Sequence, residues 1–303
     1  MKEVFNQMKI YRLNATLLML VMCALSSIAT SANAAERSVS HNLELTDPNK
    51  PAKIDVSLMS GKITVEGYKG KTVKIQATVN DLDKVKEDSW GVNVNTHVNT
   101  KIHGDAGENR PSTKGLKRVK KTNVNIDIEE RNNRVSIESH NNRDSIELIL
   151  KVPFNASLEL EVNKGQGVSV TNVYGEIEIE SVRGPITAKG VRGSIVAESS
   201  RSDMTIVFDE FNLEKPSSLT VHRGNIDVTL PSKASALIDV KNYDGEIFSG
   251  IEAEFKNVDK VEKGKSKGHQ KITIGGSMQA NLNGGKQKLL LNTFRGDMFI
   301  RSK

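Results

Sequence analysis

The stretch from Gln166 to Glu210 repeats with a period of nine residues. It reads QGVSVTNVY, GEIEIESVR, GPITAKGVR, GSIVAESSR and SDMTIVFDE, and the third and fifth residues of every block are apolar. Because side chains alternate between the two faces of a strand, these residues share one face and the polar residues between them share the other. The period therefore predicts a series of short strands, each with one buried face.

A single nine-residue block cannot fold alone. Burial of three apolar side chains contributes roughly 5–8 kcal/mol, whereas ordering the block costs about 1.5 kcal/mol per residue. Units of this kind are typical of stacked repeat proteins, in which each unit covers the next. We therefore expect an all-β fold, a short β-solenoid or β-helix-like stack of roughly nine-residue strand-turn units.

The alternating pattern continues on both sides of this array. N-terminal hairpins are expected before it, with a turn signal at Asn132–Asn133, and the motif returns afterwards as HRGNIDV, NYDGEIF and FRGDMFI. The hairpins before Pro153 and the stretch from Leu289 to Ile300 are expected to cap the two ends. Polar insert loops are expected at three places, about residues 104–122, 210–218 and 256–270.

The first 34 residues have the pattern of a Sec-type signal peptide. Lys9 and Arg12 precede an apolar run from Leu17 to Leu25, and Ala32-Asn33-Ala34 has the small-x-small form of a cleavage site. The run is short for a membrane span. We expect residues 35–303 to be a single domain, periplasmic or at the cell surface, with no stable membrane span after cleavage. An uncleaved anchor and a start at Met8 are the alternatives.

Composition excludes several classes of site. The one cysteine, Cys23, lies in the expected leader, so a mature chain has no disulfide, cysteine metal site or cysteine nucleophile. Loss of Lys2, Glu3, Lys9 and Arg12 with the leader lowers the formal charge from +6 to +4. That charge is small for a nucleic-acid-binding domain, so no nucleic-acid partner is expected.

Three segments resemble the bacterial putative-adhesin domain family. They are VPFNASLELEVNKGQGVSVTNVYGEIEIESVRGPI, RGNIDVTLPSKASALIDVKNYDGEI and GGKQKLLLNTFRGDMFIRS. The similarity extends from Lys53 to Ser302 apart from the inserts, and its most specific elements are the G-x-I-x-V repeat, Leu230-Pro231 and the ending at Gly296 to Ile300. The resemblance implies an adhesin-like β-solenoid in the cell envelope, and it offers no catalytic residue.

Three arginines form the first candidate binding site. Arg183, Arg192 and Arg201 each occupy the ninth position of successive blocks, so we expect them at equivalent corners of the array. One interpretation is a solvated row paired with the glutamates at 176, 178, 180 and 198. The other is a ladder that binds sulfate, phosphate or sugar carboxylates through bidentate contacts.

A second candidate lies in the insert at 104–122. Lys117, Arg118, Lys120 and Lys121 there could bind a polyanion or a membrane surface. The alternative is a solvated loop that keeps an edge strand from aggregating.

No cofactor or metal is expected. The corners lack the GGxGxD calcium motif, and the six histidines have no zinc-site spacing, although His97 and His103 share a possible strand and its exit. No nucleophile elbow or phosphate-binding loop occurs.

The sequence therefore predicts a non-catalytic secreted envelope protein, acting in adhesion, scaffolding or envelope sensing, with an envelope polymer or envelope protein as partner. The alternative is a carbohydrate-active β-helix enzyme acting on acidic polysaccharide, in which Asp203 and Glu176 or Glu178 would share one face. A third possibility is a signalling partner that makes its contacts through the inserts.

Overall fold

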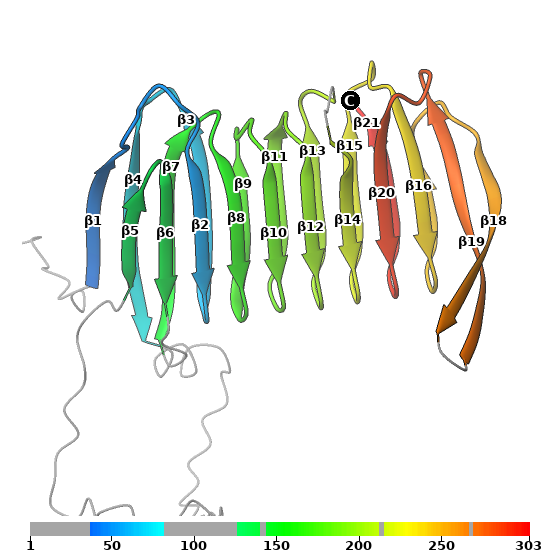
Figure 1. Cartoon of the computed structure of the whole chain (residues 1–303), viewed down its shortest axis with the longest axis horizontal. Helices are drawn as coiled ribbons and strands as arrows, with labels where there is room; N and C mark the ends of the chain where they lie inside the picture. Colours follow the sequence, from blue (N-terminus) through cyan, green and yellow to red (C-terminus); the bar gives the residue numbers. More distant parts are fainter. Residues whose placement is uncertain (1–36, 82–125, 140–143, 212–214, 267–268) are drawn as a thin grey trace, which may run out of the picture. The chain divides into compact units, whose positions relative to one another are not determined.

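The computed structural model describes residues 37–81, 126–139, 144–211, 215–266 and 269–303, all within one compact unit (Figure 1). These residues form an all-β structure of two large mixed sheets, with no helix among them. The expected signal peptide and the insert at 104–122 lie outside the described residues. Nothing in the described part of the chain is a helix that could cross a membrane.

One sheet has ten strands and the other has eleven. The ten-stranded sheet consists, in spatial order, of β1 (Arg37–Glu44), β4 (Thr72–Asp81), β7 (Asp144–Pro153), β3 (Gly61–Tyr68), β9 (Gly165–Thr171), β11 (Ile186–Val191), β13 (Met204–Phe208), β15 (Ile226–Leu230), β21 (Met298–Ser302) and β17 (Ile247–Ser249). The eleven-stranded sheet consists of β18 (Phe255–Ser266), β19 (His269–Leu282), β16 (Ala236–Asn242), β20 (Gln287–Thr293), β14 (Ser217–Val221), β12 (Ile195–Ser199), β10 (Ile177–Ser181), β8 (Ser157–Val162), β2 (Lys53–Leu58), β6 (Arg134–Ser139) and β5 (Asp127–Arg131).

Consecutive nine-residue blocks lie in opposite sheets. Strands β8, β10, β12 and β14 pair in parallel in one sheet, and β9, β11, β13 and β15 pair in parallel in the other. Ile177 is thus opposite Ile195, and Ile186 is opposite Met204. Parallel neighbours in one sheet are therefore two blocks, or eighteen residues, apart in the array, because one strand covers only one side of the core.

The buried core lies between the two sheets. The third and fifth residues of the blocks are inside it as expected: Ile177, Ile179, Ile186 and Ala188 are all at most 2% exposed. Full burial of a large aliphatic side chain contributes about 1.5–3 kcal/mol. The strands are therefore held by a continuous apolar layer as well as by their backbone ladders.

The C-terminal strands occupy an interior place. Strand β20 pairs with β14 on one side and β16 on the other, and β21 likewise pairs with β15 and β17. Figure 1 shows the red β20 between β14 and β16. The expectation that Leu289 to Ile300 caps an end is therefore wrong; β17 and the β18–β19 hairpin form that end. At the other end, β1 and β5 are outermost, as expected for the N-terminal hairpins.

Two of the expected insert loops contain strand residues. Residues 256–266, 269 and 270 lie in the antiparallel β18–β19 ladder, so the expectation of a loop is wrong for these residues: a ladder satisfies the backbone without a regular apolar pattern. The segment at 210–218 is shorter than expected, because β14 begins at Ser217. Phe211 is buried and packs edge-to-face on Phe208, with 5.0 Å between ring centroids.

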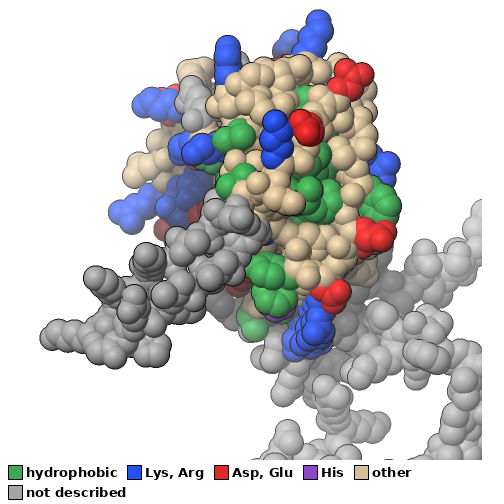
Figure 2. Space-filling model, turned by 90° about the vertical axis from the view of Figure 1, so that its right-hand side faces the viewer, with side chains coloured by type: hydrophobic (Ala, Val, Ile, Leu, Met, Phe, Trp, Pro, Cys, Tyr) green, Lys and Arg blue, Asp and Glu red, His purple; other side chains and the backbone are tan. Residues whose placement is uncertain are grey.

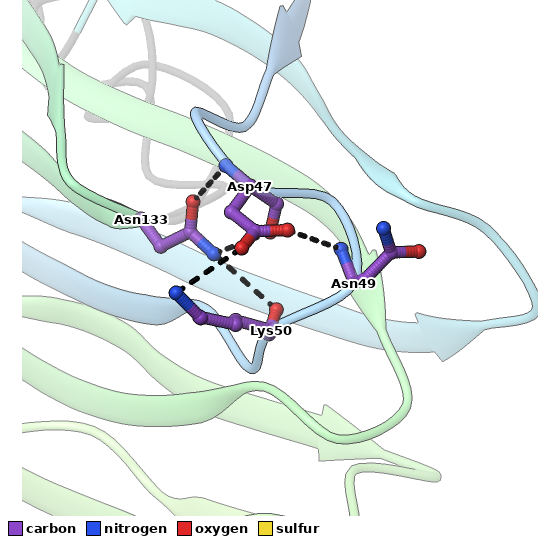
Figure 3. Close-up of polar contacts among 4 residues, drawn as sticks. All are labelled: Asp47, Asn49, Lys50 and Asn133. Atoms are coloured by element: carbon purple, nitrogen blue, oxygen red, sulfur yellow. Dashed lines mark hydrogen bonds and ion pairs between the residues drawn. The ribbon is translucent and has the colours of Figure 1, made fainter.

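The hairpin expected at Asn132–Asn133 is confirmed between β5 and β6. Both asparagines have positive φ, 54° and 66°, as a type I′ turn requires. The Asn133 side chain is buried and reaches across to the connection between β1 and β2 (Figure 3). Its Oδ1 accepts from the Asp47 backbone N–H at 2.7 Å, and its Nδ2 donates to the Asp47 carbonyl at 2.6 Å. Asn133 thereby fastens the β1–β2 connection to the sheet.

Candidate functional site

Five cations line the turns that leave the eleven-stranded sheet and enter the ten-stranded one, at the lower edge in Figure 1. Each lies two residues beyond the last paired residue of its strand, and these last residues are mutually in register. We name this set the basic edge: Lys164 after β8, Arg183 after β10, Arg201 after β12, Arg223 after β14 and Arg295 after β20. The basic edge is thus one cation per strand over five neighbouring strands.

The cations of the basic edge are closely spaced and are not held in ion pairs with described residues. Neighbouring strands are about 4.8 Å apart, so the five turns extend over about 19 Å. All five side chains are exposed. None forms an ion pair with a residue that the structure describes. The carboxylates of Asp203 and Asp297 lie in the same turns but accept backbone N–H groups instead. A row of exposed like charges that is not held in ion pairs attracts an anionic partner.

Arg192 does not belong to this row. It follows β11 and lies at the opposite edge, because successive blocks alternate between sheets. There its guanidinium lies 4.2 Å from the Tyr174 ring centroid and 2.8 Å from the Glu210 carboxylate. The expectation of three equivalent corners for Arg183, Arg192 and Arg201 is therefore wrong for Arg192, although Arg183 and Arg201 do lie at adjacent corners of the basic edge.

The expected glutamate partners are engaged elsewhere or face another way. Glu176 pairs with Lys215 at 2.6 Å, and Glu178, Glu180 and Glu198 are exposed residues of the strands β10 and β12 themselves. Among the described residues none of them pairs with Arg183 or Arg201, so the interpretation as a paired row is wrong.

Sequence reasoning missed Lys164, Arg223 and Arg295. The signal that could have found them is the shared local pattern NKG, VRG, SRS, HRG and FRG.

Side-chain oxygens fasten the turns of the basic edge to one another. Asp203 Oδ1 accepts from the Asn225 backbone N–H at 2.8 Å, and Asn225 Oδ1 accepts from that of Asp297 at 2.8 Å. Asp297 Oδ1 accepts from that of Glu246 at 2.9 Å. Gly224 and Gly296 adopt φ near 140°, and a Cβ on Gly296 would lie 2.1 Å from the Gly224 carbonyl oxygen. These contacts fix the positions from which the cations project.

The same geometry separates the carboxylates proposed for an enzyme. Asp203 lies at the lower edge before β13, where it holds a turn, whereas Glu176 precedes β10 at the opposite edge. Glu178 lies within β10, on the other sheet from β13. The expectation that Asp203 and Glu176 or Glu178 share one face is therefore wrong.

Three rings stack beside one end of the basic edge. We name these rings the aromatic column: His222 immediately follows β14, Phe294 follows β20 and Tyr243 follows β16. The centroid separations are 5.0 Å between His222 and Phe294 and 4.7 Å between Phe294 and Tyr243, with interplanar angles of 24° and 25°. In the sequence these rings are scattered; the insertion of β20 between β14 and β16 brings them together.

The aromatic column is open to solvent. Tyr243 is 65% exposed and Phe294 is 48% exposed. Figure 2, which faces the β18 end, shows hydrophobic, basic and acidic side chains together at the lower edge. The column therefore extends the basic edge as an accessible apolar strip.

The remaining candidates give no further site. Lys117, Arg118, Lys120 and Lys121, like His97 and His103, lie outside the described residues. Within the described ranges, no group of three or more His, Cys, Asp or Glu could hold a metal ion.

No family model matches the chain, and no curated protein matches it. A crystal structure described as a putative cell adhesion protein from Clostridium sporogenes is 13% identical and covers 88% of this chain and 100% of its own. Its TM-score is 0.38, so the likeness supports no argument about fold or function.

Proposed function

We propose that this chain is a secreted, non-catalytic, adhesin-like β-solenoid of the cell envelope that binds a linear polyanion along its basic edge. The observation that supports this most directly is the basic edge itself: five exposed cations in register, unpaired with any described residue. A polymer lying along the stacking direction would meet every cation in turn. Arginine favours sulfate, phosphate and carboxylate through bidentate hydrogen bonds.

Many weak contacts suit this mode of binding. A single exposed ion pair contributes about 0–1 kcal/mol. Linked contacts along one polymer act together, because each bound unit raises the effective concentration of the next. A regular edge therefore suits adhesion or scaffolding on an envelope polymer better than capture of a small anion.

The solenoid proposal rests on the alternation of blocks between two sheets and on their eighteen-residue stacking repeat. Secretion rests on the leader pattern before Ala35.

The non-catalytic proposal rests on the state of the carboxylates. Glu159 and Glu176 line a hollow of about 350 Å³ on the eleven-stranded sheet and are bound by Lys53 and Lys215. The hydrogen bond from Lys53 lowers the pKa of Glu159, whereas a general acid needs a raised pKa.

A charge-matched pair of double variants tests the proposal. Arg183→Gln with Arg201→Gln should lose most retention on immobilised dextran sulfate and keep the melting temperature of the wild type. Arg192→Gln with Lys215→Gln removes the same charge from the opposite edge and should be retained like the wild type. Equal retention of the two double variants would refute a binding site at the basic edge.

A further inference from the structure

We infer that the polyanion bound by the basic edge is an acidic polysaccharide, one uncharged sugar ring of which packs on the aromatic column at Tyr243. This inference rests on the proposed function and adds the chemical class of the ligand. Its basis is the change of side-chain chemistry along consecutive turns.

The turn after β16 carries an acidic residue, Asp244, at the position where the five neighbouring turns carry a cation. Asn242 is in register with Thr293, so Asp244 occupies the corner position that Arg295 occupies one strand earlier. Asp244 is exposed and forms no ion pair with a described residue. A ligand on this surface therefore meets an exposed cation at the corner position of each strand from β8 to β20, and a carboxylate at that position of β16. A polymer that is anionic on every unit would be repelled at Asp244.

At the same turn, Tyr243 provides an exposed aromatic surface on which an uncharged sugar ring can pack. Phe294 covers one ring face, and with 65% of its surface exposed Tyr243 presents its remaining surface and its hydroxyl to solvent. Sugar rings have an apolar face of C–H groups and a rim of hydroxyls. The apolar face packs on an aromatic ring, and the hydroxyls can donate to the Asp244 carboxylate beside it. The turn of β16 thus pairs an apolar platform with an acceptor.

The carboxylate beside Tyr243 argues against single-stranded nucleic acid. Proteins that bind single strands place bases on aromatic faces. Here the centroid separations of 4.7 and 5.0 Å leave no room for a base between the rings, so a base could stack only on the exposed surface of Tyr243, beside Asp244. Nucleic acid also has a phosphate at every unit, which Asp244 disfavours. An alternating polysaccharide, acidic at some rings and uncharged at others, matches both halves of the surface.

The aromatic column also explains why this ligand site depends on the tertiary fold. His222, Tyr243 and Phe294 come from three separate segments, and they meet because β20 inserts between β14 and β16.

The test measures binding of the secreted protein to three probes by calorimetry: hyaluronate, which alternates acidic and uncharged rings, inorganic polyphosphate and oligodeoxythymidylate. Tyr243→Ala should weaken hyaluronate binding about tenfold, the size of one aromatic stacking contact, and leave polyphosphate binding unchanged. Tyr243→Phe should restore hyaluronate binding, because it keeps the ring. Asp244→Asn should strengthen polyphosphate binding.

The possible failures are distinguishable. If Arg183→Gln with Arg201→Gln abolishes binding of hyaluronate and polyphosphate, but Tyr243→Ala alters neither, the sugar inference is wrong and the proposed function stands. Tighter binding of oligodeoxythymidylate than of hyaluronate, lost in Tyr243→Ala, would assign the site to nucleic acid instead. If the wild type binds none of the three probes and is not retained on dextran sulfate, both proposals fall.

Discussion

Replacement of Asn133 by glycine should remove the hydrogen bonds between its side chain and the β1–β2 connection while leaving the β5–β6 turn intact. Asn133 is 7% exposed, and its side chain makes two short hydrogen bonds with the backbone of Asp47 and a longer one, 3.3 Å, with the carbonyl of Lys50. Each such bond contributes about 0.5–1.5 kcal/mol net. With the two short bonds dominant, Asn133→Gly should lower the free energy of unfolding by about 1–3 kcal/mol. Glycine keeps the positive φ of 66°, so turn strain does not contribute.

Asn132 supplies the matched control. It is the neighbouring turn residue, has φ 54°, is exposed, and makes no side-chain hydrogen bond with a described residue. Asn132→Gly makes the same change to the unfolded chain, so the difference between the two variants isolates the buried amide. Urea unfolding followed by circular dichroism gives the two midpoints at a common slope. If Asn133→Gly unfolds at the same urea concentration as Asn132→Gly, the hydrogen bonds of the Asn133 side chain do not stabilise the fold.

Three further perturbations test the fold. Hydrogen bonds from the Thr46 backbone, and then from the Asn133 backbone and the Thr46 hydroxyl, lower the pKa of Glu130 below its ordinary 4.5. The stability that the Glu130 carboxylate contributes is therefore complete above pH 4.5, and it is lost as the pH falls through the lower pKa of the folded state. Urea unfolding of Glu130→Gln should show a weaker loss of stability between pH 5 and 3, and an unchanged loss would contradict this. Gly296→Ala should lower the free energy of unfolding by about 2–4 kcal/mol in the same assay, because the added Cβ would meet the Gly224 carbonyl oxygen. Gly250→Ala, where no atom lies nearer than 3.8 Å to the added Cβ, should not. Equal effects of the two variants would show that the contact between Gly296 and Gly224 is not what requires glycine. Truncation after Gly285 removes β20 and β21 and should give an aggregating, protease-sensitive product; a soluble, resistant one would show that the inner strand pair is dispensable.

The sequence predicted the strands of the array and their inward faces well. Alternation within a strand is a local property, so Ile177 and Ile179 could be assigned to the core without knowledge of any neighbour. The turn at Asn132–Asn133 was equally local, because asparagine tolerates the positive φ that the turn needs.

The basic edge could be predicted in part. Arg183 and Arg201 were identified as corner residues, but Arg192 was grouped with them because nine residues was taken as the stacking unit. A nine-residue block supplies one strand and one turn. The core lies between two sheets, so the chain passes through one strand of each sheet, with two turns, before it returns to the same edge. The period in the sequence is therefore half the period in space, and alternate corners diverge.

What the sequence determined by itself is the set of strands, their buried faces and the sharp turns between them, since each depends on a few adjacent residues. Only the tertiary structure decided which strands are neighbours. Strand β20 fits between β14 and β16 because both offer free backbone groups and matching apolar faces, a condition set by segments far apart in the chain. That choice aligns Arg223 with Arg295 and stacks Tyr243 on Phe294, so the candidate site exists only in the assembled fold.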